Sequence, residues 1–152
     1  MPDDSTPTLE GFQTFVRDIM QVPGGAVPPD GVLGMVFRLA NDLVIRDLRL
    51  IDGSLYTDCV YNLAASYLLK FAQDTASSTP PGYWAKVREQ LGMNSTTPGL
   101  IQSSSDNGTS QSWMIPDSLK NLSLADLDAM KNPYGQFYLS IMQQYGSVWG
   151  WA

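Results

Sequence analysis

Residues 54–73, SLYTDCVYNLAASYLLKFAQ, decide the fold of this chain. Apolar side chains recur there at the three- and four-residue spacing of an α-helix. The stripe consists of Tyr56, Val60, Leu63, Tyr67 and Phe71. Ser54 is a residue type that caps helix N-termini, and the small residues of 64–66 allow another helix to approach closely. The stretch therefore predicts a long helix, ending near Gln73, against which other helices pack.

The residues on the N-terminal side predict two more helices. Leu9 to Met20 follow helical spacing after a start at Thr6-Pro7. Residues 32–46 carry two adjacent apolar stripes, with Asp30 as the expected N-cap after two prolines. The stripes are Val32, Val36, Leu39 and Leu43, and Leu33, Phe37, Ala40 and Val44. An apolar face this wide predicts a mostly covered helix.

The C-terminal half predicts shorter helices. Residues 83–91 form one, with Trp84, Val87 and Leu91 inward and Gly92 as its stop. Residues 118–130 form a connecting helix. The dipeptide Asn132-Pro133 begins the last helix in the usual order of cap and proline, and Gly146 ends it. Its expected apolar face is Tyr134, Phe137, Tyr138, Ile141, Met142 and Tyr145, mostly core.

Residues 99–115, GLIQSSSDNGTSQSWMI, predict a polar β-hairpin arm that turns at Asn107-Gly108. Neither face of the two strands is apolar enough to form a core, and an isolated ribbon is marginal in water. We therefore expect the arm to become ordered against another molecule. The alternative interpretation is a disordered Ser-rich loop.

The tail 147–152, SVWGWA, follows the expected helix stop and carries two tryptophans. Tryptophan is a favoured anchor at protein interfaces. The alternative is a tail that folds back onto its own domain. The predicted partner-binding residues of the arm and tail are Ser103, Ser105, Asn107, Gly108, Ser110, Ser112, Trp113, Val148, Trp149 and Trp151.

Composition excludes several classes of function. The 152 residues suffice for one domain with one core. A net charge of −6 without a basic run disfavours binding to nucleic acid or anionic membranes. One cysteine excludes an internal disulfide and favours an intracellular origin, and neither a signal peptide nor a membrane span is expected.

The sequence does not predict a catalytic, cofactor-binding or metal-binding site. Without histidine the chain lacks the commonest general base and metal ligand. No nucleophile–base pair can be named, and acidic pairs such as Asp126 and Asp128 fit solvated surface carboxylates. We therefore expect no enzyme activity, no cofactor and no metal.

The order of five segments resembles the head–tail connector (adaptor) proteins of tailed bacteriophages. The segments are FQTFVRDI (12–19), PPDGVLGMVFRLAND (28–42), YNLAASYLLKFA (61–72), GLIQSSSDNGTSQSW (99–113) and NPYGQFYLSIMQQYG (132–146). The third is similar to the family's Tyr-x-x-Ala-Ala-x-x-Leu helix and the fifth to its closing Thr-x-Tyr-Gly-x-x-Tyr helix. The chain departs from that pattern at Asn132-Pro133, where the family commonly has Thr before Tyr-Gly, and in its more elaborate residues 116–131.

Together, the predicted elements indicate a mainly α protein: a small helical bundle with a long polar β-hairpin arm and an extended C-terminal tail. The helical body would span about 9–92 and 118–146 of a single adaptor domain. Such proteins form a ring of about twelve copies below the portal protein, a head-to-tail cyclic assembly. The ring extends the DNA channel, lets DNA pass without specific binding and docks the tail terminator or another neck protein.

The implied location is the neck of the virion, with assembly in the host cytoplasm and no membrane. The acidic balance suits a channel wall that repels phosphate. Two alternatives remain open: another ring protein of the neck, similar to a tail terminator, or an acidic helical regulatory module that caps a basic partner.

Overall fold

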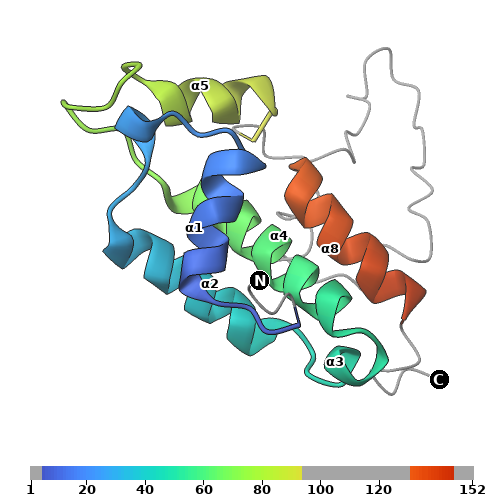
Figure 1. The fold of residues 1–152 in the computed structure, drawn as a ribbon. Helices are drawn as coiled ribbons and strands as arrows, with labels where there is room; N and C mark the ends of the chain where they lie inside the picture. Colours follow the sequence, from blue (N-terminus) through green and yellow to red (C-terminus); the bar gives the residue numbers. More distant parts are fainter. Residues whose placement is uncertain (1–4, 94–130, 146–152) are drawn as a thin grey trace, which may run out of the picture.

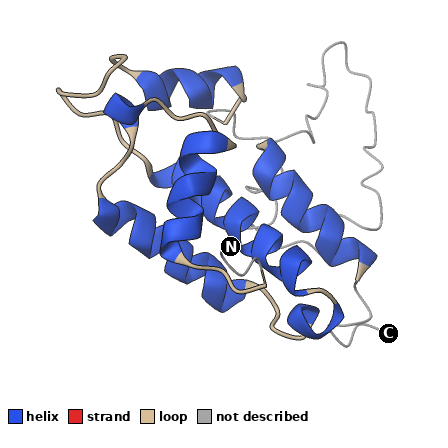
Figure 2. Cartoon of the chain, in the orientation of Figure 1, coloured by secondary structure: helices blue, strands red, loops and turns tan. Residues whose placement is uncertain are grey.

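The computed structural model describes residues 5–93 and 131–145, which fold into helices joined by loops (Figures 1 and 2). The helices are α1 (Leu9–Asp18), the short 3-10 helix η1 (Gly24–Ala26), α2 (Asp30–Leu43), α3 (Leu48–Ile51), α4 (Gly53–Phe71), α5 (Tyr83–Gln90) and α8 (Pro133–Gln144). None of the residues in these two ranges forms a strand. The expected mainly α class is confirmed. The predicted arm 99–115, the connecting helix 118–130 and the tail 147–152 lie outside the described residues.

Helix α4 is the centre of the bundle, as residues 54–73 predict. Helices α1, α2, α3, α5 and α8 all pack against it, with α2 and α8 on different sides (Figure 1). The small side chains of Ala64, Ala65 and Ser66 are buried, which confirms the expected close approach of neighbouring helices. Asp52, rather than Ser54, is the N-cap, because its carboxylate accepts hydrogen bonds from the backbone N–H of Ser54 (2.9 Å) and of the residue after it (3.3 Å).

Helix α2 departs from the prediction. Pro29 precedes it as the N-cap residue, so that Asp30 lies in the first turn. One of the predicted stripes is covered, since Leu33, Ala40 and Val44 are buried. The other is covered only in part: Val36 is fully buried, whereas Leu39 and Leu43 are 39% and 54% exposed, so the prediction of a mostly covered helix fails for these two leucines. Helix α2 lies at the edge of the bundle and packs on α1 and α4 only along part of its circumference.

Helix α1 joins the bundle through stacked and tilted aromatic rings. Phe12 is fully buried, with its ring centroid 6.2 Å from that of Phe37 on α2 and 6.1 Å from that of Tyr61 on α4. Thr8 caps the helix by accepting a hydrogen bond from the backbone N–H of Gly11 (3.0 Å). The predicted start near Thr6 is therefore two residues early.

Helix α5 is tied to the loop after α4 and to η1. The Asp74 carboxylate accepts hydrogen bonds from the backbone N–H of Trp84 (2.9 Å) and of Ala85 (3.0 Å) and so satisfies the first turn of α5. The buried Trp84 indole donates to the carbonyl oxygen of Ala26 (2.8 Å). Trp84 is inward, as the sequence predicts, and Gly92 ends the helix with a positive φ of 70°.

Arg88 of α5 closes the other end of α4. Its Nη1 donates to the carbonyl oxygens of Leu69 (2.9 Å) and Ala72 (2.6 Å). These carbonyls lie in the last turn of α4 and just beyond it, where no further helical N–H follows to bond them. Both ends of α4 are therefore held by side chains, one by Asp52 and the other by Arg88.

Candidate functional site

All ten predicted partner-binding residues lie outside the described residues. Ser103, Ser105, Asn107, Gly108, Ser110, Ser112 and Trp113 fall in 94–130, and Val148, Trp149 and Trp151 fall in 146–152. The arrangement of the predicted arm and tail therefore stays a prediction. The surface available for a partner on the described residues is that of the helices.

Helix α8 is fixed to α4 by a buried polar contact. Asn132 is 1% exposed, and its side-chain oxygen accepts a hydrogen bond from the backbone N–H of Gly135 (2.8 Å). Its amide nitrogen donates to Ser66 Oγ on α4 at 3.0 Å. One side chain thus caps α8, as the sequence predicts, and also sets the position of α8 on α4.

The inward face of α8 is only partly the one that the sequence predicts. Tyr138 is buried, and Tyr134 meets the ring of Phe15 on α1 edge-on at 6.1 Å between centroids. Leu139 is buried at 5% exposure although the predicted stripe omits it. Phe137, in contrast, is 36% exposed, so its assignment to the core is wrong. The buried residues of α8 are Gly135, Tyr138 and Leu139, so its buried face is rotated relative to the predicted stripe.

The outward face of α8 carries no charge. Its exposed residues are Pro133, Gln136, Phe137, Ser140, Gln143 and Gln144. No Asp, Glu, Lys or Arg occurs in Pro133–Gln144, whereas every α-helix within residues 5–93 contains at least one. Charge depletion with aromatic enrichment marks the centre of protein interfaces. The absence of charge is visible in the sequence run PYGQFYLSIMQQ, but of its aromatic residues only Phe137, which the prediction assigned to the core, lies on this face.

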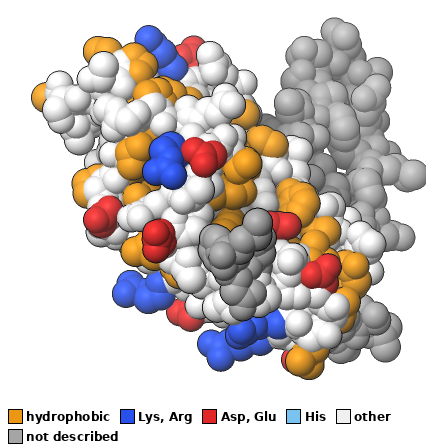
Figure 3. Space-filling view, viewed as in Figure 1, with side chains coloured by type: hydrophobic (Ala, Val, Ile, Leu, Met, Phe, Trp, Pro, Cys, Tyr) orange, Lys and Arg blue, Asp and Glu red, His pale blue; other side chains and the backbone are white. Residues whose placement is uncertain are grey.

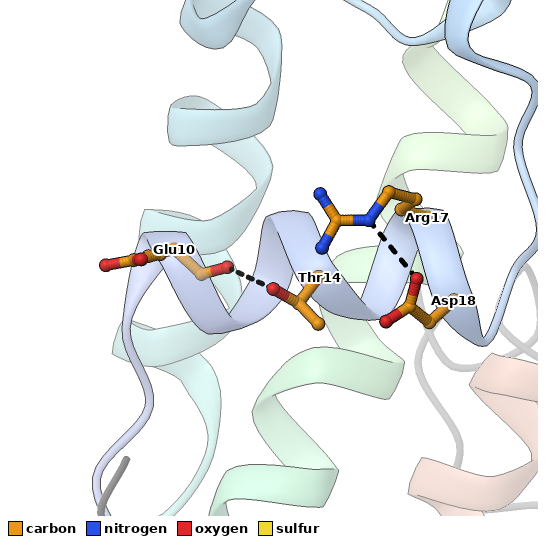
Figure 4. Close-up of polar contacts among 4 residues, drawn as sticks. All are labelled: Glu10, Thr14, Arg17 and Asp18. Atoms are coloured by element: carbon orange, nitrogen blue, oxygen red, sulfur yellow. Dashed lines mark hydrogen bonds and ion pairs between the residues drawn. The ribbon is translucent and has the colours of Figure 1, made fainter. Parts of the chain in front are cut away.

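Helix α1 shows the ordinary pattern for comparison (Figure 4). Arg17 and Asp18 form an ion pair with 3.2 Å between Nε and Oδ1, and their side chains are 67% and 58% exposed. Thr14 Oγ1 donates to the carbonyl oxygen of Glu10 at 3.2 Å. Such an exposed pair contributes little to stability, about 0–1 kcal/mol. The outer side of α1 is a solvated charged surface, unlike that of α8.

A second exposed apolar set lies on α2, facing away from α1. The ring contact with Phe12 places α1 on the Phe37 side of α2. At about 100° per residue, Leu39 and Leu43 lie on the other side of that helix. In α8, Phe137 follows Tyr134 by three residues and so lies near the side that meets α1. The exposed leucines of α2 therefore lie away from α1, whereas Phe137 of α8 lies near it.

The small helix α3, which the sequence analysis missed, adds two more exposed apolar side chains. Leu50 is 86% and Ile51 is 50% exposed. Leu48 anchors the helix in the core. Arg49 lies over the ring of Tyr56, 5.4 Å from its centroid. The chain thus exposes leucine on both α2 and α3, the two helices directly before α4.

Most of the negative charge of the chain belongs to residues outside the described ranges. Residues 5–93 and 131–145 contain eight Lys or Arg and nine Asp or Glu, so their formal charge is −1 out of a total of −6. Acidic and basic side chains are scattered over the face shown in Figure 3, with no broad area of one sign. Six acidic residues and one lysine belong to 1–4, 94–130 and 146–152. An acidic wall, if the protein forms one, has to come from those segments.

Among the described titratable groups, burial is the main cause of the resolved pKa shifts. It raises the pKa of Cys59 to about 12, with a smaller contribution from the negative charge of Asp58. Burial also raises the pKa values of the Tyr83 and Tyr134 hydroxyls. A thiol that stays protonated is a poor nucleophile and a poor metal ligand.

The described ranges contain no group of three or more His, Cys, Asp or Glu residues that could hold a metal ion. Nor does any helix within them combine the length and apolar character needed to cross a membrane. Comparison with protein-family profiles, with curated proteins and with solved structures finds no match to this chain.

Proposed function

We propose that this protein is a structural component of a tailed-bacteriophage virion, a head–tail connector that forms a ring below the portal. In this function the helical body is the repeating unit of the ring, which extends the DNA channel and presents a surface to the tail. The order of segments that resembles the connector family supports the proposal, and so does the mainly α fold of the described residues.

The observation that carries the proposal is the charge-free outward face of α8, together with the exposed leucines of α2. A solvated helix normally carries charges on its outer face, as α1 does at Arg17 and Asp18. Neutral amides and an exposed phenylalanine are instead suited to burial against another protein. Asn132 and Ser66 hold this face rigidly on α4, which lowers the entropic cost of docking.

The arm and tail have the finer roles in this proposal. Residues 99–115 form a β-hairpin that adds backbone hydrogen bonds along a neighbour or the portal. Trp149 and Trp151 insert into a partner as aromatic anchors. The six acidic residues outside the described ranges then suit a channel through which DNA passes without being held.

The test is assembly with the portal protein of the virus that encodes this chain. The purified proteins are mixed, separated by sedimentation and imaged in negative stain. We expect the chain to cosediment as an added ring on the portal. A deletion of 147–152 should weaken that association, whereas Glu89→Gln, on the exposed surface of α5, should leave it unchanged.

Two results would overturn the proposal. One is a chain that stays monomeric or dimeric with no affinity for the portal, as a regulatory module would. The other is a ring that forms only on assembled tail tubes, which would assign the chain to the tail-terminator class. If the truncated chain binds the portal as tightly as the full chain, the role of the tail is refuted.

A further inference from the structure

Helix α3 presents two adjacent apolar side chains to solvent, Leu50 and Ile51, defined here as the α3 pair. Leu50 is 86% exposed, more than any other large apolar side chain of residues 5–93 and 131–145, and Ile51 is 50% exposed. Leu48, at 1% exposure, anchors the helix in the core, so the pair is held outward. Single exposed leucines are ordinary on protein surfaces, whereas adjacent apolar side chains leave a continuous area that gains from being covered.

Helix α8 ends at the same end of the bundle at which α3 lies. Its start is fixed by the 3.0 Å hydrogen bond from Asn132 to Ser66, and from there α8 runs antiparallel to α4 (Figure 1). At about 1.5 Å per residue, Pro133–Gln144 extends about 18 Å, and α4 extends about 20 Å from Ser66 back to Gly53. The last turn of α8 therefore lies level with the start of α4, and α3 directly precedes that start.

The tail begins where α8 ends. Tyr145 is the last described residue and packs against the core, and the tail (147–152) follows it after Gly146. Seven residues reach at most about 23 Å, and neighbouring helix axes in a bundle lie about 8–10 Å apart. The α3 pair is therefore within reach of the tail. No side chain of the tail is charged, so covering the pair would leave no ionised side chain without water.

We propose that the tail of each copy covers the α3 pair of the same copy before assembly, with Trp149 and Trp151 laid over Leu50 and Ile51. Tryptophan suits such a half-exposed position, because its ring is apolar and its N–H can still reach water. Since the tail is tethered within a few residues of α3, its effective concentration there is of the order of millimolar. A separate protein has to exceed that concentration to compete, and this advantage selects the chain's own tail as the occupant.

The inference rests on the proposed function in one respect, since a partner that takes the two tryptophans has to displace them from α3. The apparent dissociation constant of the tail for that partner then rises by the inverse of the fraction of copies whose tail is off α3. The α3 pair thus competes with the partner for the tail and keeps its aromatic side chains covered until the partner is present.

Thiol labelling of the full chain tests the contact. Leu50→Cys is made with the natural tail and with the tail variant Trp149→Ser/Trp151→Ser, and the rate of reaction with a maleimide dye is measured on the free protein. The native Cys59 is fully buried and serves as the blank. Ile19→Cys is the matched control, because Ile19 is 62% exposed and follows α1 at the end of that helix farther from α3 (Figure 1).

We expect Leu50→Cys to be labelled about tenfold more slowly with the natural tail than with the serine tail, a ratio that corresponds to about 1.4 kcal/mol. Ile19→Cys should react equally fast with both tails. Trp113→Ser, which changes a tryptophan outside the tail, should leave the slow labelling unchanged. Equal rates for Leu50→Cys with the two tails would overturn the inference, and so would fast labelling caused by Trp113→Ser.

Fluorescence gives a second readout with the natural tryptophans in place. Leu50→Ser/Ile51→Ser should shift the tryptophan emission of the free chain to longer wavelength, because the substitutions remove the apolar surface that covers the tail rings. Ile19→Ser should not shift it. Equal thermal unfolding of both variants shows that the bundle is intact. An unchanged emission maximum with the α3 variant overturns the contact.

Serial dilution identifies which copy supplies the tail. Slow labelling of Leu50→Cys that persists on dilution supports a contact within one chain. Protection that fades on dilution means that the tail of another copy covers α3, and it overturns the inference.

Addition of the portal separates this inference from the proposed function. On the portal, labelling of Leu50→Cys should become fast, because the tail moves to the partner. A chain that shows slow labelling but ignores the portal supports the inference and refutes the function. A chain that binds the portal without showing slow labelling in its free form refutes the inference and leaves the function standing.

Discussion

For the substitution Gly11→Ala, helix propensity and packing predict opposite changes in the free energy of unfolding. Gly11 lies in α1, where alanine is more favourable than glycine by about 0.8–1.0 kcal/mol in a solvated helix. A Cβ at this position, however, would overlap Tyr61 Oη and lie 3.0 Å from Tyr61 Cζ and 3.1 Å from Thr8 Oγ1. Two of these atoms are in use, because Oη accepts from the backbone N–H of Thr8 at 3.1 Å and Oγ1 caps α1.

Gly11→Ala should therefore destabilise the protein. An extra methyl group in a packed site costs about 1–3 kcal/mol, which exceeds the gain from helix propensity. The partial loss of the hydrogen bond from the Thr8 N–H to Tyr61 Oη adds to this cost. The free energy of unfolding is measured by urea denaturation followed by circular dichroism at 222 nm. Gly34→Ala in α2 is the matched control, because nothing lies within 4 Å of its Cβ, and it should stabilise by about 0.5–1 kcal/mol.

A double-mutant cycle with Tyr61→Phe assigns the cause. That substitution removes the overlapping Oη and leaves Cζ at 3.0 Å as the nearest ring atom, so alanine at position 11 should cost less in the phenylalanine background. We expect a coupling of about 1 kcal/mol or more between the two sites. A stabilising Gly11→Ala, or a cost that Tyr61→Phe does not change, would refute the packing argument.

Three further predictions concern the contacts that hold the bundle. Ser66→Ala leaves the buried Asn132 amide without its acceptor, and the free energy of unfolding should fall by about 1–3 kcal/mol. If the losses caused by Ser66→Ala and Asn132→Ala simply add up in the double variant, measured in the same urea assay, the hydrogen bond is contradicted. Asp74→Ala removes the acceptor for two N–H groups of α5 and should cost about 1 kcal/mol, with loss of protection of α5 amides in hydrogen exchange; unchanged exchange would count against it. The pKa of Cys59 is about 12 in the folded chain, above its ordinary value of 9.0, so the unfolded thiol loses its proton first. Its contribution to stability is therefore complete below pH 9 and is lost as the pH rises towards 12. Chemical denaturation across that range should show a shallower decline for Cys59→Ala than for the wild type, and a thiol reagent should label the native chain only as it unfolds.

Local sequence patterns predict the positions of the helices better than they predict which side chains of those helices are exposed. The central helix is evident from residues 54–73, since an apolar pattern around the whole helix is unusual unless other helices surround it. The order Asn132-Pro133 fixes the start of α8, because both residues act through local backbone geometry. The second role of Asn132, its bond to Ser66, joins residues 66 positions apart and has no local signal.

Exposure depends on what lies beside a helix, and spacing alone does not reveal it. Leu39 and Leu43 have the same helical periodicity as the covered stripe of α2, yet only one side of that helix meets the bundle. The capping of α4 by Arg88 likewise depends on how α5 folds back. The sequence shows that the α8 segment lacks charged residues. Its apolar stripe at helical spacing nevertheless favours a core position for Phe137, and the 36% exposure of that side chain contradicts this assignment.

The sealed ends of α4 bear on how this helix opens. Asp52 is bonded at one terminus and Arg88 at the other, so the backbone groups of both end turns are satisfied within the chain. Fraying from either end requires one of these side chains to detach first. We therefore expect the terminal amides of α4 to exchange hydrogen nearly as slowly as its central ones.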